Sequence, residues 1–139
     1  MGDEARNVGL LKEAYKRWHD SKGGSVDHLM TLVADDIQFG SIARGAAPLA
    51  FTRAVSNKEA LRGYFDGLIG DFSMIHYTID NYVADGDIVF VRCTTSWKNK
   101  KTGKAFETPK ADFWRFRDGK VVEFYEFYDT AQVMASAVA

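Results

Sequence analysis

The first third of the chain carries apolar residues at helical spacing. Leu11, Tyr15 and Trp18 lie four and three positions apart, so they form one stripe of a helix predicted from about Asp3 to Asp20. A Ser-Lys-Gly-Gly stretch ends this pattern, and Ser25 is the expected N-cap of a short second helix. The apolar positions of that second helix are Val26, Leu29, Met30 and Val33.

A third helix is predicted after an irregular segment. Residues 34–40 can begin a strand, and residues 41–55 contain the Gly, Pro and small residues that suit a loop. Ser56 to Glu59 then reads Ser-Asn-Lys-Glu, a capping box with Ser56 as the N-cap. The helical stripe behind it consists of Leu61, Tyr64, Phe65 and Leu68.

From Phe72 onward the apolar period changes to two, which is typical of β-strands. Turn signals at Asp85-Gly86, Thr102-Gly103 and Asp118-Gly119 separate the apolar runs. We therefore expect residues 74–129 to form an antiparallel meander. Helices first and a meander second predict an α+β fold, with the helices packed on one face of a curved sheet.

The last two strands each place a carboxylate among aromatic residues. Because successive strand side chains point to opposite faces, Asp112 shares a face with Trp114 and Phe116. The pattern predicts no other charge on that face. An outward-facing Asp112, or one paired with an arginine such as Arg92 or Arg115, is the alternative. In the next strand the face that contains Glu126 also contains Val122, Phe124 and Tyr128.

Composition narrows the classes of function. The chain has 139 residues, expected to form one domain over residues 1–139, and 14% of them are aromatic. With 18 basic and 19 acidic residues it lacks the basic excess of nucleic-acid-binding proteins. Cys93 is the only cysteine, which excludes an intrachain disulfide, and His19, His28 and His76 show no zinc-ligand spacing.

The N-terminal residues are charged and lack the apolar core of a signal peptide. No apolar run approaches the ~20 residues that a membrane-spanning helix needs. We therefore expect a soluble, cytoplasmic protein that has neither a membrane nor a nucleic acid as its partner.

The order of elements and several strings resemble SnoaL-like members of the nuclear transport factor 2 superfamily, which contains ketosteroid isomerases and polyketide cyclases. The resemblance covers residues 5–134. It implies a cone, a strongly curved antiparallel sheet wrapped by helices, with a pocket opening into its interior and no cofactor. The strings are LMTLVADDIQF (residues 29–39), NKEALRGYF (57–65), ADFWRFRDGKVVEF (111–124) and FYDTAQVMA (127–135).

The resemblance also implies catalytic roles. Asp112 matches the neutral oxyanion-hole aspartate of ketosteroid isomerases, and Tyr15 matches its tyrosine partner. Poor hydration beside Trp114 would favour the neutral form of Asp112. The family's base position reads Ser41, which cannot take a proton at neutral pH without a base of its own. Glu126 is then the substitute base, or else a carboxylate that only accepts hydrogen bonds from neighbouring strands.

The expected pocket is mostly aromatic. Plain core packing is the favoured alternative for Cys93, Thr95 and Trp97. Asp129 is expected to cap a short C-terminal helix. The residues expected to line the pocket are Trp18, Ser41, Tyr64, Phe65, Cys93, Thr95, Trp97, Trp114, Phe124 and Tyr128.

These features predict a small hydrophobic or aromatic ligand. If the protein is an enzyme, we expect cofactor-free proton transfer: isomerisation, cyclisation or hydration next to a carbonyl. A ligand-binding protein without turnover, favoured by Ser41, and a protein-interaction adaptor are the alternatives. The resemblance further implies a homodimer through the convex sheet face, where Phe113, Tyr125 and Phe127 alternate with charged residues. The charged residues on that face are Arg115 and Glu123.

Overall fold

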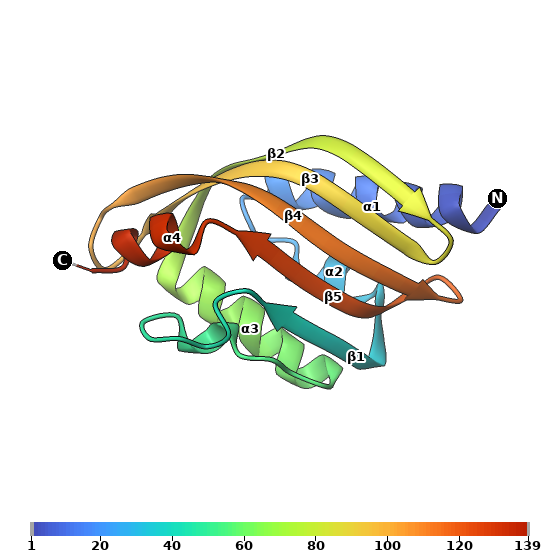
Figure 1. The fold of residues 1–139 in the computed structure, drawn as a ribbon, viewed down its shortest axis with the longest axis horizontal. Coiled ribbons are helices and arrows are strands. Elements are labelled where there is room, and N and C mark those ends of the chain that lie inside the picture. The colour runs from blue at the N-terminus through green and yellow to red at the C-terminus, as the bar shows by residue number, and fades with distance from the viewer. Residues whose placement is uncertain (1, 139) are drawn as a thin grey trace.

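The computed structural model describes residues 2–138, and it consists of one curved sheet with helices against its inner side (Figure 1). Met1 and Ala139, which the single-domain prediction included, lie outside the described residues. The predicted α+β fold is confirmed. The elements follow in the order α1 (Gly2–Asp20), α2 (Val26–Met30), β1 (Val33–Ser41), the 3-10 helix η1 (Ala50–Thr52), α3 (Lys58–Asp71), β2 (Phe72–Asp85), β3 (Ile88–Asn99), β4 (Ala105–Arg117), β5 (Lys120–Tyr128) and α4 (Thr130–Ser136).

The sheet has the strand order β1-β5-β4-β3-β2. All pairings from β2 to β5 are antiparallel, so the predicted meander is confirmed. The first strand adds a feature that the sequence did not indicate, because β1 pairs with β5 in parallel. In the ladder between β4 and β5, Asp112 lies directly opposite Glu126. Directly opposed residues share a sheet face, so both carboxylates point to the same side.

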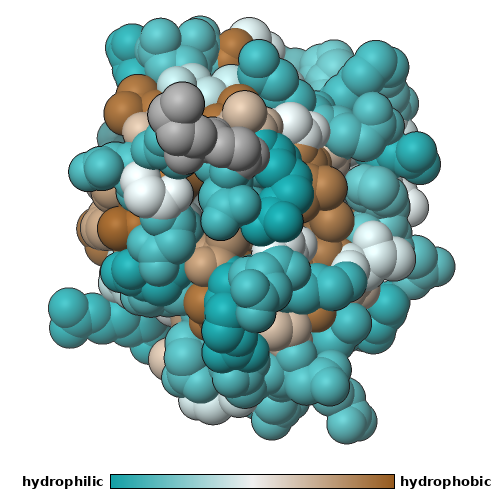
Figure 2. Space-filling view, turned by 90° about the vertical axis from the view of Figure 1, so that its right-hand side faces the viewer, coloured by the Kyte–Doolittle hydropathy of each residue, from teal (hydrophilic) through white to brown (hydrophobic). Residues whose placement is uncertain are grey.

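The helices bury the stripes that the sequence predicted. Helix α1 packs across β2 and β3 with Leu11, Tyr15 and Trp18 turned inward, and α3 packs against β1 and β2. The two helices and the inner sheet face thus enclose the core. The end of the molecule seen in Figure 2 is mostly hydrophilic, with hydrophobic side chains in separate areas between polar ones. Among the described residues, no helix is long and apolar enough to cross a membrane.

Two predicted helix starts require correction. Ser25 precedes α2, but its side chain makes no capping hydrogen bond. Val33, predicted as part of the same helix, belongs instead to β1, where it pairs with Val121. The N-cap of α3 is Asn57 rather than Ser56, since the Asn57 side chain accepts a 2.8 Å hydrogen bond from the Ala60 amide. Both residue types cap helices well, so sequence preference does not separate neighbouring candidates.

The predicted face of β5 also changes at its start. Arg115 pairs with Glu123 while Phe116 pairs with Val121, so one extra residue of β5 stands between these pairs as a β-bulge. Val121 is therefore fully buried and Val122, predicted for the inner face, is only half-buried. From Phe124 onward the predicted alternation is confirmed.

Candidate active site

A cavity lies between the inner sheet face and the helices. The cavity has a volume of about 80 Å³, counted as the space open to the centre of a water molecule. A single water occupies roughly 10–15 Å³ by the same measure, so the cavity holds several waters or one small ring. Its lining residues come from α1 (Tyr15, Trp18), α3 (Tyr64, Phe65), the inner faces of β2 to β5, and α4 (Val133).

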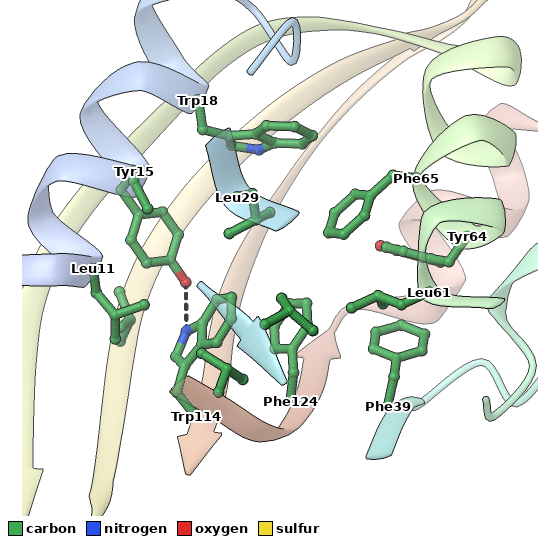
Figure 3. Packing of buried hydrophobic residues seen from close by; sticks show 14 of the residues in the cluster. Leu11, Tyr15, Trp18, Leu29, Phe39, Leu61, Tyr64, Phe65, Trp114 and Phe124 are labelled. Carbon is green, nitrogen blue, oxygen red and sulfur yellow. Dashed lines mark hydrogen bonds between the residues drawn. The ribbon is translucent and has the colours of Figure 1, made fainter. Parts of the chain in front are cut away.

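Aromatic rings form most of the cavity wall (Figure 3). Trp114 stacks on Phe124 with ring centroids 3.9 Å apart and planes 7° from parallel. Across from them, Trp18 of α1 and Phe65 of α3 meet edge to face, with centroids 5.6 Å apart. A planar apolar molecule would therefore meet ring faces and edges on several sides, which is the usual composition of a small-molecule pocket.

One cation stands between the two carboxylates of the wall. Lys110 is two residues before Asp112 on β4, and its ammonium nitrogen lies 2.6 Å from Glu126 Oε2 and 3.0 Å from Asp112 Oδ1. It also donates a 2.5 Å hydrogen bond to the Tyr77 hydroxyl. Burial lowers the pKa of Lys110, but Asp112 and Glu126 together raise the pKa above its ordinary value, so the side chain is an ammonium at neutral pH.

Asp112 is the centre of a hydrogen-bond cluster. Its Oδ2 accepts hydrogen bonds from the Tyr15 hydroxyl and, at 3.2 Å, from the Tyr77 hydroxyl. The Trp114 indole N–H donates to Tyr15 at 2.9 Å, as Figure 3 shows. Burial, followed by the charge of Asp112, raises the pKa of both tyrosines well above its ordinary value, so both remain protonated donors.

Glu126 is the second carboxyl of the cavity. Tyr64 donates a 2.6 Å hydrogen bond to its Oε1, while Lys110 holds its Oε2. Burial raises the pKa of Glu126, Lys110 opposes that rise, and the charge of Asp112 adds to it, so the pKa ends above its ordinary value. The site contains one ammonium and two carboxyls, so protonation of one carboxyl, Glu126, makes its net charge zero. Glu126 is therefore the group of the site best suited to exchange one.

The structure brings most of the predicted residues together. Tyr15, Asp112 and Glu126 converge in the cavity, as expected from the resemblance. The prediction that no other charge shares their face was wrong, because Lys110 points to the same side. Asp112 does not pair with an arginine either. The predicted lining residues found in the wall are Trp18, Tyr64, Phe65, Thr95, Trp97, Trp114, Phe124 and Tyr128.

Two predicted lining residues lie outside the cavity. Ser41 is buried behind Tyr128, with its hydroxyl 2.6 Å from the tyrosine hydroxyl. The Cys93 thiol lies 3.6 Å from the Lys110 carbonyl oxygen, against the neighbouring strand rather than in the cavity. Burial and the charge of Asp112 raise the pKa of Cys93 to about 12, so Cys93 remains a thiol.

The Asp129 cap of α4 is confirmed, since the Asp129 side chain accepts a hydrogen bond from the Gln132 amide.

Sequence reasoning missed two residues of the site. Lys110 could have been found by the same period of two that placed Asp112, because residues 110, 112 and 114 alternate on one strand. Tyr77 carried no such signal, since its role depends on how β2 curves over the cluster. Among residues 2–138, no three His, Cys, Asp or Glu side chains gather as a metal site would require.

Comparison with known proteins identifies the family and similar folds. A model of the SnoaL-like domain matches residues 12–124. A search of curated proteins found no match. Among solved structures, an NTF2-like protein of unknown function from Burkholderia pseudomallei K96243 is 18% identical, with 96% of this chain and 98% of that one covered and a TM-score of 0.85.

Two further structures have similar folds at low identity. A proposed SnoaL-like polyketide cyclase from Jannaschia sp. CCS1 is 16% identical, with coverage of 98% and 94% and a TM-score of 0.78. A hypothetical protein of ketosteroid isomerase-like fold from Catenulispora acidiphila DSM 44928, solved with trimethylamine, is 20% identical, with coverage of 94% and 93% and a TM-score of 0.75. Since the domain model spans most of the chain, this protein belongs to the family of SnoaL-like domains.

Proposed function

We propose that this protein binds a small, largely apolar ring-bearing molecule and transfers a proton within it, with Glu126 as the acid–base group. The reaction class is cofactor-independent isomerisation, cyclisation or hydration. The observation that carries the proposal is a buried carboxyl of raised pKa that lines an aromatic cavity. The similar structures include a proposed polyketide cyclase and a hypothetical protein of ketosteroid isomerase-like fold, which supports this class of chemistry.

Glu126 has the properties that proton transfer needs. A general base is most effective when its pKa approaches the working pH, and burial moves the pKa of Glu126 upward in that direction. Tyr64 and Lys110 each hold one of its oxygens, so the carboxyl is fixed relative to the cavity. Fixing the reacting group in this way reduces the entropy lost on reaching the transition state.

The remaining polar groups set the electrostatics of the reaction. Lys110 stabilises the ionised form of Glu126 and also lies beside Asp112. Tyr15 and Tyr77 hold Asp112 from the other side, so the aspartate and the ammonium keep fixed positions. We assign the Tyr15–Asp112 pair an indirect role, in which it orients the Lys110 ammonium that faces Glu126.

Hydrogen exchange into a small ketone tests the proposal. Cyclohex-2-enone in deuterated buffer should exchange its α-protons faster with the wild-type protein than with buffer alone, followed by proton NMR. Glu126→Gln should lose about 10²-fold or more of this acceleration. Glu123→Gln is the matched control, because Glu123 is on the same strand but pairs with Arg115 on the outer face. Equal rates for the wild type and Glu126→Gln would refute the role of Glu126.

Ligand binding without turnover is the second candidate, and the position of Ser41 favours it. The residue at the family's base position is bonded to Tyr128 and lies outside the cavity. Binding of the enone without any acceleration of exchange would support this candidate over the enzyme.

A further inference from the structure

Most donors of the polar cluster are hydrogen-bonded within the protein. Tyr15 and Tyr77 each have one hydroxyl hydrogen, and both donate to Asp112. The hydroxyl hydrogen of Tyr64 goes to Glu126. The Lys110 ammonium donates hydrogen bonds to Tyr77 and Glu126 at 2.5 and 2.6 Å. It also forms an ion pair with Asp112 Oδ1 at 3.0 Å, without a hydrogen bond to that oxygen. A carbonyl or oxyanion entering the cluster would therefore compete with Asp112 for the one remaining ammonium hydrogen of Lys110.

Two of the three indole N–H groups of the wall also donate within the protein, and the Trp18 indole is the exception. The Trp114 indole donates to Tyr15, and the Trp97 indole donates to Thr95 at 2.7 Å. Thr95 itself donates to the His76 carbonyl. The Trp18 indole, which makes no hydrogen bond to any described residue, is in the aromatic wall against Phe65 and Trp97. The Tyr128 and Ser41 hydroxyls share one hydrogen bond of 2.6 Å, in which either can be the donor.

Acceptor positions, in contrast, remain open on Glu126. Each carboxylate oxygen can accept two hydrogen bonds. Asp112 Oδ2 already accepts two, from Tyr15 and Tyr77, whereas Oδ1 is buried, accepts none and faces the Lys110 ammonium at 3.0 Å. Glu126 Oε1 accepts one, from Tyr64, and Oε2 accepts one, from Lys110. Glu126 thus retains one open position on each oxygen, and it lines the cavity.

We infer that the ligand is a hydrogen-bond donor: a neutral phenol or enol whose hydroxyl donates to Glu126 while its ring lies among the aromatic side chains. This inference rests on the proposed function and names the substrate class of the same site. The ionised phenolate or enolate is disfavoured, because it would face the acceptor positions of Glu126 in a cluster where two carboxyls already share the single Lys110 ammonium. The site therefore selects the protonated form, and the bound hydroxyl is positioned to give its proton to Glu126.

Two probes of the same size class test the inference. 4-Nitrophenol has the hydroxyl, and 4-nitroanisole carries a methyl ether in its place. We expect neutral 4-nitrophenol to bind tenfold or more tightly than 4-nitroanisole, since a hydrogen bond to a carboxylate is worth at least that factor. Its affinity should fall tenfold per pH unit once the free phenol ionises, and the phenolate absorption should decrease on binding.

The variants separate this inference from the proposed function. Glu126→Gln should shrink the preference for the phenol over the ether, because the amide is a weaker acceptor, while Glu123→Gln should retain the full preference. Equal affinity for both probes, or tighter binding of the phenolate at high pH, would overturn the inference while leaving small-molecule binding intact. Failure of both probes and of the enone to bind the wild-type protein would overturn the inference and the proposed function together.

Discussion

Lys110 and Glu126 form a buried ion pair across adjacent strands, with the ammonium nitrogen 2.6 Å from Glu126 Oε2. The same ammonium lies 3.0 Å from Asp112, so one cation serves two carboxyls of the cavity. The pair therefore links the stability of the fold to the chemistry of the site.

Removing the cation should destabilise the protein strongly. Lys110→Met leaves Asp112 and Glu126 buried without their counter-charge, and breaking a buried pair in this way costs about 3–5 kcal/mol of unfolding free energy. Urea denaturation at neutral pH measures the loss. Lys98→Met, at an exposed position of β3, is the control. In the double variant with Glu126→Gln, much of the loss should be recovered; a loss below about 1 kcal/mol in Lys110→Met alone would contradict the prediction.

The pH dependence of stability should report Glu126. Its pKa is raised in the folded state, so the folded protein binds more protons than the unfolded chain between the ordinary and the raised pKa. The free energy of unfolding should therefore decrease as pH rises through that window. Urea denaturation at several pH values should reveal this slope in the wild type and a flatter profile in Glu126→Gln. The same slope in both proteins would assign the effect to another group.

Truncating an aromatic wall should weaken binding of a flat apolar probe. Trp97 lines the cavity and is almost fully buried. Trp97→Ala should reduce the affinity for naphthalene by about 1.5–3 kcal/mol, because the probe loses contact area with the indole. Fluorescence of the probe measures the affinity, and Phe127→Ala, on the outer face, is the control. Unchanged affinity in a folded Trp97→Ala variant would indicate that the probe binds elsewhere.

The outer sheet face should mediate a homodimer. Phe90 packs edge to face on Phe113, Arg115 lies over the Phe113 ring, and Tyr125 contacts Phe127. Phe90 and Phe127 are nevertheless 42% and 39% exposed. A mixed surface of aromatic and charged groups suits association of two copies. Light scattering at micromolar concentration should give the dimer mass.

Charge placed on this face should dissociate the dimer. Phe90→Asp should give a monomer, whereas Lys101→Asp, in the turn between β3 and β4, should remain dimeric. A wild-type protein that is monomeric at this concentration would refute the dimer.

The start of α3 offers a matched pair of capping variants. Asn57 accepts a hydrogen bond from the Ala60 amide, and its neighbour Ser56 does not cap the helix. Asn57→Ala should therefore lower the unfolding free energy by about 1 kcal/mol, while Ser56→Ala should change it little. Thermal or urea denaturation distinguishes the two. A larger loss for Ser56→Ala would move the cap back to the position that the sequence alone suggested.

Side-chain periodicity determined much of the fold before any tertiary contact was considered. The helical spacing of Leu11, Tyr15 and Trp18 and the period of two after Phe72 gave the element types. The same period placed Asp112 and Trp114 on one inner face. These features are local, because the backbone of a helix or a strand fixes the direction of each side chain relative to its neighbours in the chain.

The composition of the site was decided by tertiary structure. Tyr15 and Asp112 are 97 residues apart in the chain, and they meet only because α1 packs across the curved sheet. Tyr77 and Tyr64 reach the two carboxyls from β2 and α3 for the same reason. Periodicity determines which side chains share a face. The curvature of the sheet and the packing of the helices on it determine which faces, distant in the chain, come into contact. The same packing fixes which carboxyl oxygens are still free to accept a hydrogen bond.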